Sequence, residues 1–275
     1  SGAAASCRLP ILPKMGSGAS AHESATAAVA AGVSEGEIAA HLASLDKKPV
    51  TVFYNPGSSN SLSCAILGSS IGCAELKVIQ LTGEQKEEAF IAVNPYGQVP
   101  GMSDESNGLN LGESTAILRY LAQQYKPSLY PGSIAERARI DMAISQFKEF
   151  VYEPWHLGKD SSAGYVGVSY CVLGDLFGIP MWPYPKDQPA ANAGFVDALN
   201  KWAGLYLQGK FVCGDALTIA DYCAVAILYV AVSPKVAEKT SFEAPERIKK
   251  YVTDFLAVEP AAAELFGQAF TGLLY

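Results

Sequence analysis

The chain reads NPYGQVP at residues 94–100. The Asn-Pro step ends a predicted helix over 87–93, because the residue before a proline is biased away from helical geometry. Val99-Pro100 opens a predicted strand over 99–102, and a second strand over 109–111 follows a Ser-Asn-Gly turn. This stretch therefore marks the point where alternating strands and helices give way to an antiparallel hairpin.

The segments on either side of this stretch complete a small domain. The β-branched and aromatic run TVFY at residues 51–54 predicts a first strand, and 76–81 predicts a second. Apolar residues at helical spacing predict helices over 61–71, with Gly72 as its stop, and over 113–125. The resulting order predicts an α/β domain in which helices pack on a small mixed sheet.

The second half of the chain contains no predicted strand. After Lys126-Pro127, apolar spacing predicts helices only, over residues 134–152, 195–207, 218–232 and 246–257. The third of these is apolar nearly all round, so we expect it at the centre of a helical bundle. Thr218 and Asp221 precede it with the spacing of a capping box, which indicates a structural role.

The first 48 residues differ in composition from the rest. They are rich in Ala, Gly and Ser, and we expect a flexible extension with one short helix, capped by Ser34 and Glu37. The predicted domains are thus the extension (1–48), the α/β domain (49–126) and the all-α domain (127–275). Residues 15–20 fit the myristoylation pattern, so a membrane partner is expected only if Gly16 becomes an acylated N-terminus.

The overall composition excludes several classes of protein. Apolar residues make up 49% and charged residues 17% of the chain, which excludes a mostly disordered protein. The net charge of −7 argues against a nucleic-acid partner. Six scattered Cys without a C-x-x-C pair, and only three His, predict no metal site and indicate reduced thiols inside a cell.

Four stretches together resemble the cytosolic glutathione S-transferase family, in a Ser-type or a beta- or nu-like class. They are FYNPGS at 53–58, NPYGQVP at 94–100, ESTAILRYL at 113–121 and GDALTIAD at 214–221. The resemblance implies a thioredoxin-like domain followed by a helical domain. It also implies glutathione as co-substrate, a small apolar electrophile as second substrate, a homodimer, a cytoplasmic location and a role in detoxification.

The resemblance assigns a glutathione-binding role to several of these residues. A cis bond between Val99 and Pro100 turns the backbone of Val99 outward, where it can pair with a short peptide. Gln98 helps to hold the peptide backbone. Glu113 and Ser114 begin a helix whose free N–H groups favour the γ-glutamyl carboxylate. Gln85, or the neighbouring Lys86, corresponds to the residue that some relatives use for the glycyl carboxylate.

The catalytic residue stays open between two positions. Ser58 directly follows Pro56-Gly57, as the catalytic serine does in Ser-type classes, and a hydroxyl that donates to sulfur stabilises the reactive thiolate. Asn60 matches the position of the cysteine of the beta class and of the asparagine in classes with disulfide-reductase activity. Ser59 is a third candidate. An active Asn60 would favour a glutathione-dependent disulfide reductase or peroxidase, and a chain without turnover would be a ligand-binding or interaction protein.

Aromatic residues of the second domain are the candidates for the hydrophobic substrate pocket. Tyr152 and Trp155 end the helix predicted over 134–152 or follow it closely, and Tyr165 and Phe177 lie in the aromatic segment 156–190. Apolar and aromatic walls suit a small apolar ligand. His156 is expected to be a packed or surface residue and not a catalyst.

Overall fold

The computed structural model describes residues 24–158, 167–178, 183–270 and 272–274. Its sheet has four strands in the order β2-β1-β3-β4. The central strand β1 pairs in parallel with β2 and antiparallel with β3, which in turn pairs antiparallel with β4. The predicted mixed sheet is confirmed. The strands are β1 (Val50–Tyr54), β2 (Ala74–Val78), β3 (Gly101–Asp104) and β4 (Leu109–Leu111).

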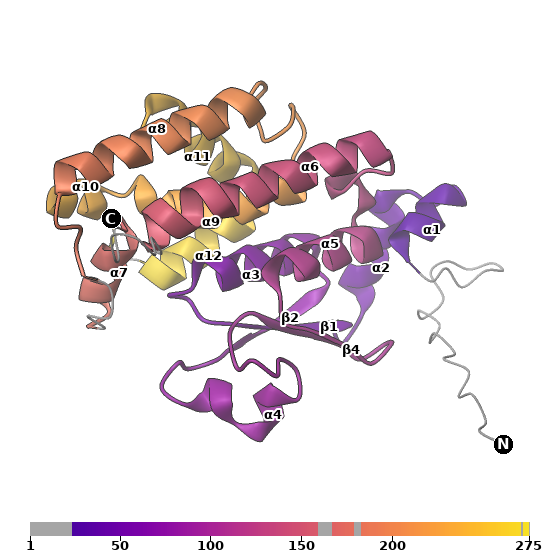
Figure 1. Cartoon of the computed structure of the whole chain (residues 1–275). Coiled ribbons are helices and arrows are strands. Elements are labelled where there is room, and N and C mark those ends of the chain that lie inside the picture. The colour runs from indigo at the N-terminus through magenta and orange to yellow at the C-terminus, as the bar shows by residue number, and fades with distance from the viewer. Residues whose placement is uncertain (1–23, 159–166, 179–182, 271, 275) are drawn as a thin grey trace, which may run out of the picture.

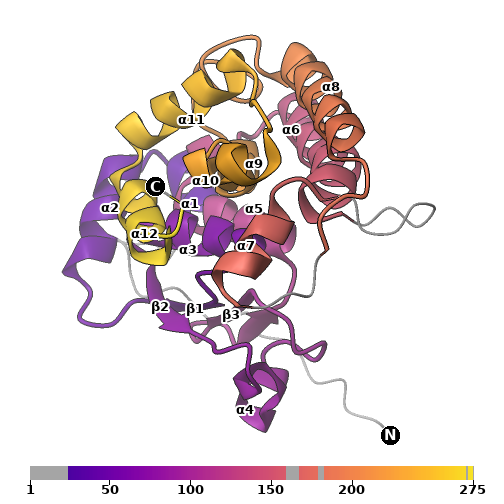
Figure 2. The same ribbon diagram turned by 90° about the vertical axis from the view of Figure 1, so that its left-hand side faces the viewer.

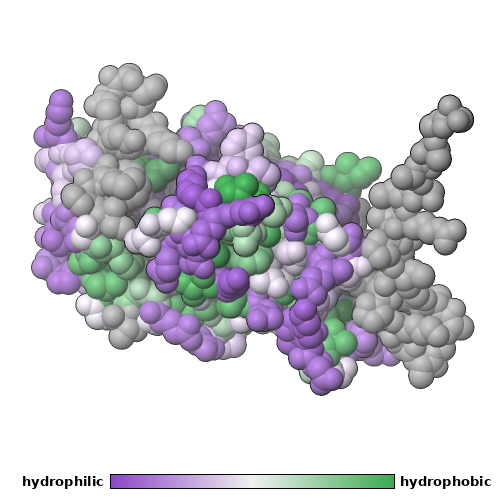
Figure 3. Space-filling model, turned by 90° about the horizontal axis from the view of Figure 1, so that it is seen from below, coloured by the Kyte–Doolittle hydropathy of each residue, from purple (hydrophilic) through white to green (hydrophobic). Residues whose placement is uncertain are grey.

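Helices cover both faces of this sheet. The long helices α3 (Ser59–Ile71) and α5 (Ser114–Tyr125) lie between the sheet and the helical part of the molecule, whereas α4 (Glu88–Ile91) projects from the opposite face (Figure 1, Figure 2). Phe90 of α4 meets Phe53 of β1 edge to face, with ring centroids 5.8 Å apart. Figure 3 views the molecule from this side and shows hydrophobic residues set among hydrophilic ones.

Two predicted strands of the α/β part are corrected, and the first is the strand predicted over 76–81, which lies at Ala74–Val78. The strand predicted over 99–102 begins only at Gly101, and Val99 stays outside the strand. Pro100 has no N–H to donate to a ladder, and the Val99-Pro100 bond is cis, as the resemblance implied. Helix α3 ends as predicted, with Gly72 in the left-handed conformation.

The second half of the described chain is helical, as the sequence predicts. Helix α6 ends at Phe147 and continues to Leu157 as a π-helical segment, η3, which corrects the single helix predicted over 134–152. The helix predicted over 195–207 begins earlier, where Asp187 caps it. The helices are η2 (Pro127–Leu129), α6 (Ile134–Phe147), η3 (Lys148–Leu157), α7 (Tyr170–Leu176), α8 (Gln188–Tyr206), α9 (Ile219–Ala231), α10 (Pro234–Thr240), α11 (Glu246–Val258) and α12 (Pro260–Phe270).

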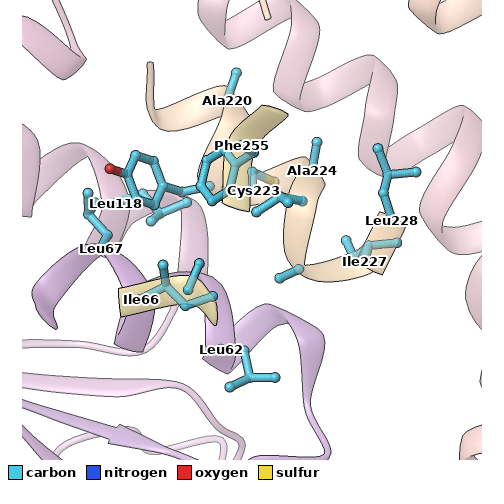
Figure 4. Close-up of a cluster of buried hydrophobic side chains, with 14 of the residues drawn as sticks. Leu62, Ile66, Leu67, Leu118, Ala220, Cys223, Ala224, Ile227, Leu228 and Phe255 are labelled. Carbon is cyan, nitrogen blue, oxygen red and sulfur yellow. The ribbon is translucent and has the colours of Figure 1, made fainter. Parts of the chain in front are cut away.

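Helix α9 joins the two halves of the molecule. The predicted capping box is present: Asp221 accepts hydrogen bonds from the N–H and the hydroxyl of Thr218. The helix packs against α3 through side chains that are almost fully buried, including Leu62 and Ile66 of α3 and Ile227 of α9 (Figure 4). This shared apolar core fixes the α/β part against the helical part, so residues of both can contribute to one site.

Residues 24–44 form two helices where the sequence predicts one. Helix α2 (Glu35–Ser44) has the predicted capping box of Ser34 and Glu37. The additional helix, α1 (Ala25–Ala30), packs against α5, and the hydroxyl of Thr26 donates to the carbonyl of Gln123 at 2.7 Å. Figure 1 shows α1 beside α5, and α2 lies next to α1. Gly16 and the rest of the myristoylation pattern lie outside the described residues.

In the part of the chain that the structure describes, no single helix has the length and apolar composition needed to cross a membrane. Helices α9 and α10 meet these criteria only when taken together, across a bend of 50°.

Candidate functional site

The loop between β1 and α3 holds Ser58 at the start of a helix. The side-chain oxygen of Asn55 accepts from the N–H of Gly57, and its amide donates to the carbonyl of Ile79. The buried hydroxyl of Ser61 bonds to the carbonyl of Asn55 at 2.8 Å and lies 3.0 Å from that of Ser58. These bonds fix the loop, so the place of Ser58 does not depend on a ligand.

The Ser58 hydroxyl is available to donate a hydrogen bond. Ser58 is the N-cap of α3, and its oxygen accepts from the N–H of Ser61 at 3.4 Å. Among the described residues, its proton has no acceptor. The residue is half-buried, and the N-terminus of a helix of 13 residues carries a positive partial charge. This combination suits an anionic sulfur.

The two following residues are placed differently. Ser59 is buried, and its hydroxyl has no hydrogen-bond partner in the described structure. The amide of Asn60 donates to the hydroxyl of Tyr152 at 3.0 Å. Asn60 therefore joins α3 to the helical part of the molecule, and its amide group already has a protein partner.

Asn94, which no motif marks as a site residue, organises the loop around Val99. Its buried amide nitrogen lies within hydrogen-bond distance of the carbonyl groups of Gln98 (2.6 Å), Pro100 (3.3 Å) and Gly112 (3.3 Å). The Val99 N–H and C=O have no partner among the described residues. The loop thus presents one free backbone donor and one free acceptor, which is the requirement for pairing with an extended peptide.

We expect replacement of Asn94 by alanine to damage both stability and the Val99 loop. Removing the amide leaves buried carbonyl groups without a donor, which costs about 2 kcal/mol of unfolding free energy. Affinity for glutathione should fall at least several-fold. Urea denaturation and titration calorimetry would measure the two effects. Asn110→Ala is the matched control, because that exposed side chain makes one bond, to Ala92; equal losses in both variants would contradict this role for Asn94.

The start of α5 forms a second polar corner. Its first intrahelical bond runs from the N–H of Ile117 to the carbonyl of Glu113, so the N–H groups before Ile117 point out of the helix end. Glu113 is exposed and makes no capping bond, and Ser114 is buried. The Lys148 ammonium, from the start of η3, donates to the Ser114 hydroxyl at 3.4 Å. Lys148 was missed because the two residues are 34 positions apart.

The two candidates for the glycyl carboxylate are engaged in their own loop. The Gln85 amide accepts from the N–H of Gly83 and donates to the carbonyl of Leu81. Lys86 donates to the carbonyl groups of Tyr96 and Gly97 at 3.2 and 3.0 Å. Both side chains stabilise the chain segment that leads into the Val99 loop. The Gln98 side chain is exposed, with no bond to a described residue.

The aromatic residues predicted to line the substrate pocket contact different parts of the molecule. Tyr152 meets Asn60, as described above. The ring of Trp155 packs against Gly194 of α8, where a β-carbon would collide with it, and Tyr165 lies outside the described residues. Phe177, at the end of α7, lies against the loop before α3: a β-carbon on Gly57 would be 3.4 Å from its ring. Phe177 is therefore the described aromatic residue of this segment that lies against the Ser58 loop.

His156, which the sequence suggests is a packed or surface residue, is fully buried. Its Nδ1 lies 2.6 Å from the Ser169 hydroxyl, its ring stacks on Tyr152, and its Nε2 has no partner in the described structure. Burial lowers the pKa of His156 to about 3. Within the described residues, no group of three or more His, Cys, Asp and Glu side chains could hold a metal ion.

This histidine should make stability depend on pH. The unfolded chain binds a proton on His156 below its ordinary pKa of about 6.5, whereas the folded protein stays neutral there, so stability is lost as the pH falls. The loss should be about 3 kcal/mol between pH 7 and pH 4, from about 1.4 kcal/mol per pKa unit. In urea denaturation, His156→Gln should remove this slope relative to wild type, and His41→Gln should keep it. An unchanged slope in His156→Gln would contradict the assignment.

Both halves of the molecule match domain families of known proteins. Residues 48–123 match the glutathione S-transferase N-terminal domain, and residues 183–259 match the C-terminal domain of the same family. A probable glutathione S-transferase of Oryza sativa, GSTF2, is 26% identical over 218 residues, which are 76% of this chain and 92% of that protein. Together the two domain matches span more than half of the chain.

Solved structures show the same fold. A delta-class glutathione transferase of Nilaparvata lugens superposes with a TM-score of 0.61 and 25% identity, over 82% of this chain and 100% of that one. Maize glutathione S-transferase I, in complex with an atrazine glutathione conjugate, gives a TM-score of 0.59 and 24% identity, over 79% and 98%. The chain belongs to the glutathione S-transferase family.

Proposed function

We propose that this protein conjugates glutathione to apolar electrophiles, with Ser58 as the residue that activates the thiol. The observation that carries the proposal is the Ser58 hydroxyl at the N-terminus of α3, whose proton has no acceptor among the described residues, inside a loop fixed by Asn55 and Ser61. The thiolate is the nucleophilic form of a thiol, whose ordinary pKa is about 8.5. A hydroxyl donor and a helix N-terminus both stabilise the anion, so they lower that pKa.

In this proposal, glutathione lies extended across the edge of the sheet. Its cysteinyl backbone pairs with the free N–H and C=O of Val99, beside Gln98 and the cis-Pro100. Its γ-glutamyl end sits at the start of α5, where Glu113 suits the ammonium and Ser114 the carboxylate. This orientation brings the thiol between the Val99 loop and the loop that joins β1 to α3, toward Ser58.

The second substrate would enter beside the aromatic residues of the helical half. Phe177 lies against the Ser58 loop, and Tyr152 adjoins Asn60 at the base of α3. In the reaction, the thiolate sulfur forms a bond to an electrophilic carbon and a leaving group such as halide departs with its electron pair. The thiol proton has passed to solvent water before the attack, so the protein supplies anion stabilisation and positioning.

Conjugation of an aryl halide tests this function. The full chain is incubated with glutathione and the halide, and the thioether is measured by absorbance and by mass. We expect turnover that saturates with glutathione. Binding of glutathione without thioether formation, for a series of aryl halides, enones and epoxides, would contradict the proposal and favour a ligand-binding protein.

A disulfide reductase is the competing enzyme, and Asn60 is the residue that would carry it. The Asn60 amide donates to Tyr152, which favours a bridging role over contact with sulfur. We therefore expect Asn60→Ala to lower conjugation modestly. Rapid reduction of a mixed glutathione disulfide, lost in Asn60→Ala and kept in Ser58→Ala, would reverse the assignment.

We also propose that the protein is a cytoplasmic homodimer that acts in detoxification, as is typical of its family. Exposed apolar residues on α6, Ile134 (87% exposed) and Met142 (48% exposed), are compatible with a partner surface. Light scattering should give about twice the 29.1 kDa of one chain. A monomeric mass across a wide range of concentrations would contradict the dimer.

A further inference from the structure

Lys148 places a positive charge at the start of α5. It stands where α6 passes into η3, and its ammonium reaches across to the α/β part, 3.4 Å from the Ser114 hydroxyl. Tyr152, one turn further along η3, reaches the same part of the molecule through Asn60. In a π-helix the residues i and i+4 lie near one face, so η3 directs both side chains across the domain boundary.

This charge has no carboxylate partner among the described residues. The ion pairs of the described chain involve other lysines and Arg119, and Lys148 is half-buried. Its charge partly offsets the effect of burial, which raises the pKa of the neighbouring Cys64 and Cys223 thiols. A cation held in this way, beside neutral thiols and a hydroxyl, is suited to an anion from outside the protein.

Several other groups at this corner also favour an anion. The N–H groups before Ile117 have no partner in the part of the chain that the structure describes, and they lie at the end of a helix of 12 residues, which carries a positive partial charge. The Ser114 oxygen accepts from Lys148, so its own proton stays available, and a hydroxyl that accepts from an ammonium is a stronger donor. The exposed Glu113 lies beside them. Positive and negative groups side by side match a zwitterionic amino-acid end.

We infer that Lys148 is a further glutathione-binding residue, which binds the α-carboxylate of the γ-glutamyl group together with Ser114 and the start of α5. The inference rests on the proposed function, because it concerns the same ligand. It makes the glutathione site incomplete without the helical domain. It also makes Lys148 a specificity residue: a thiol peptide without the α-carboxylate loses the partner of this charge.

The test compares two ligands on two proteins by titration calorimetry. The ligands are glutathione and its analogue 4-aminobutyryl-cysteinylglycine, which lacks only the α-carboxylate. The full-length proteins are wild type and Lys148→Met, a neutral side chain of similar length. We expect Lys148→Met to bind glutathione at least about tenfold more weakly, as for loss of a hydrogen bond to a charged group, and to bind the analogue as wild type does.

Two controls separate this role from a structural one. Lys201→Met removes an exposed lysine of α8 and should leave both affinities unchanged. Lys148→Arg keeps the charge and should retain most of the affinity for glutathione. If Lys148→Met does not fold, Lys148→Gln takes its place, because its neutral amide can keep a hydrogen bond to the Ser114 hydroxyl while removing the charge, and the same selective loss of affinity for glutathione is expected.

The outcomes are distinct. Equal affinity of wild type for glutathione and the analogue, or an equal loss for both ligands in Lys148→Met, would overturn the inference and leave the proposed function standing. A wild-type protein that binds neither ligand would overturn both. A tenfold loss confined to glutathione supports the inference.

Discussion

Replacing Ser58 by alanine is expected to lower kcat/KM for conjugation by about 100- to 1,000-fold, as for loss of one hydrogen-bond donor to a reacting anion. The change leaves the loop intact, because Asn55 and Ser61 hold it through their own bonds. Glutathione should still bind, since Val99, Glu113 and Ser114 are untouched. The loss should therefore appear in kcat more than in KM. It should shrink as the pH approaches the pKa of the free thiol, because the thiolate then forms without help from the protein.

Two neighbouring variants make this result specific. Ser59→Ala removes a buried hydroxyl that has no hydrogen-bond partner in the described structure, so activity should be close to wild type. Asn60→Ala removes the bond to Tyr152 and should cost less than Ser58→Ala. Steady-state rates across a pH series measure all three. A larger loss in Ser59→Ala or Asn60→Ala than in Ser58→Ala would mean that another residue activates the thiol.

Replacing Asp221 by alanine is expected to lower the free energy of unfolding by about 3–5 kcal/mol, because buried donors lose their acceptor. The fully buried carboxylate accepts from the N–H groups of Val212 and Thr218, both at 2.8 Å, and from the Tyr251 hydroxyl at 3.0 Å. Asp221 lies in the first turn of α9, whose apolar surface joins the two halves of the molecule (Figure 4). The loss of stability should therefore affect both domains.

A second capping box provides the control for Asp221. Glu37 makes the equivalent bond to the N–H of Ser34 at 2.9 Å, in an exposed position. Glu37→Ala leaves its donors accessible to water, so the loss of stability should be much smaller. Urea denaturation, followed by circular dichroism, compares the two. Similar losses would contradict the claim that burial makes the Asp221 network important.

Local sequence signals predicted most of the fold. The TVFY run, the turn at 106–108 and the glycine at position 72 each specify a strand, a hairpin or a helix end by themselves, and all appear in the structure. The apolar character of α9 predicted its central burial, because this signal too lies within the segment itself. The helix α1 was missed because its Ala-rich sequence has only a narrow apolar face, and its packing on α5 depends on distant residues.

The candidate site was less accessible to sequence reasoning, because its groups meet through tertiary contacts. Motifs brought Ser58, Val99 and Ser114 to attention, but their hydrogen-bond partners are not neighbours in the chain. Asn94 reaches Gly112 across 18 positions, and Asn60 reaches Tyr152 across 92. The π-helical continuation of α6, which directs Lys148 and Tyr152, also had no recognisable sequence signal.

The most direct test of the central claim is the pKa of the glutathione thiol when it is bound to this protein. The thiolate is followed by its ultraviolet absorbance in a pH titration of the complex, for wild type and Ser58→Ala. We predict a pKa clearly below the ordinary value of about 8.5 in wild type, and a return toward that value in Ser58→Ala. A bound thiol that titrates like free glutathione in wild type, or identically in both proteins, would contradict the account.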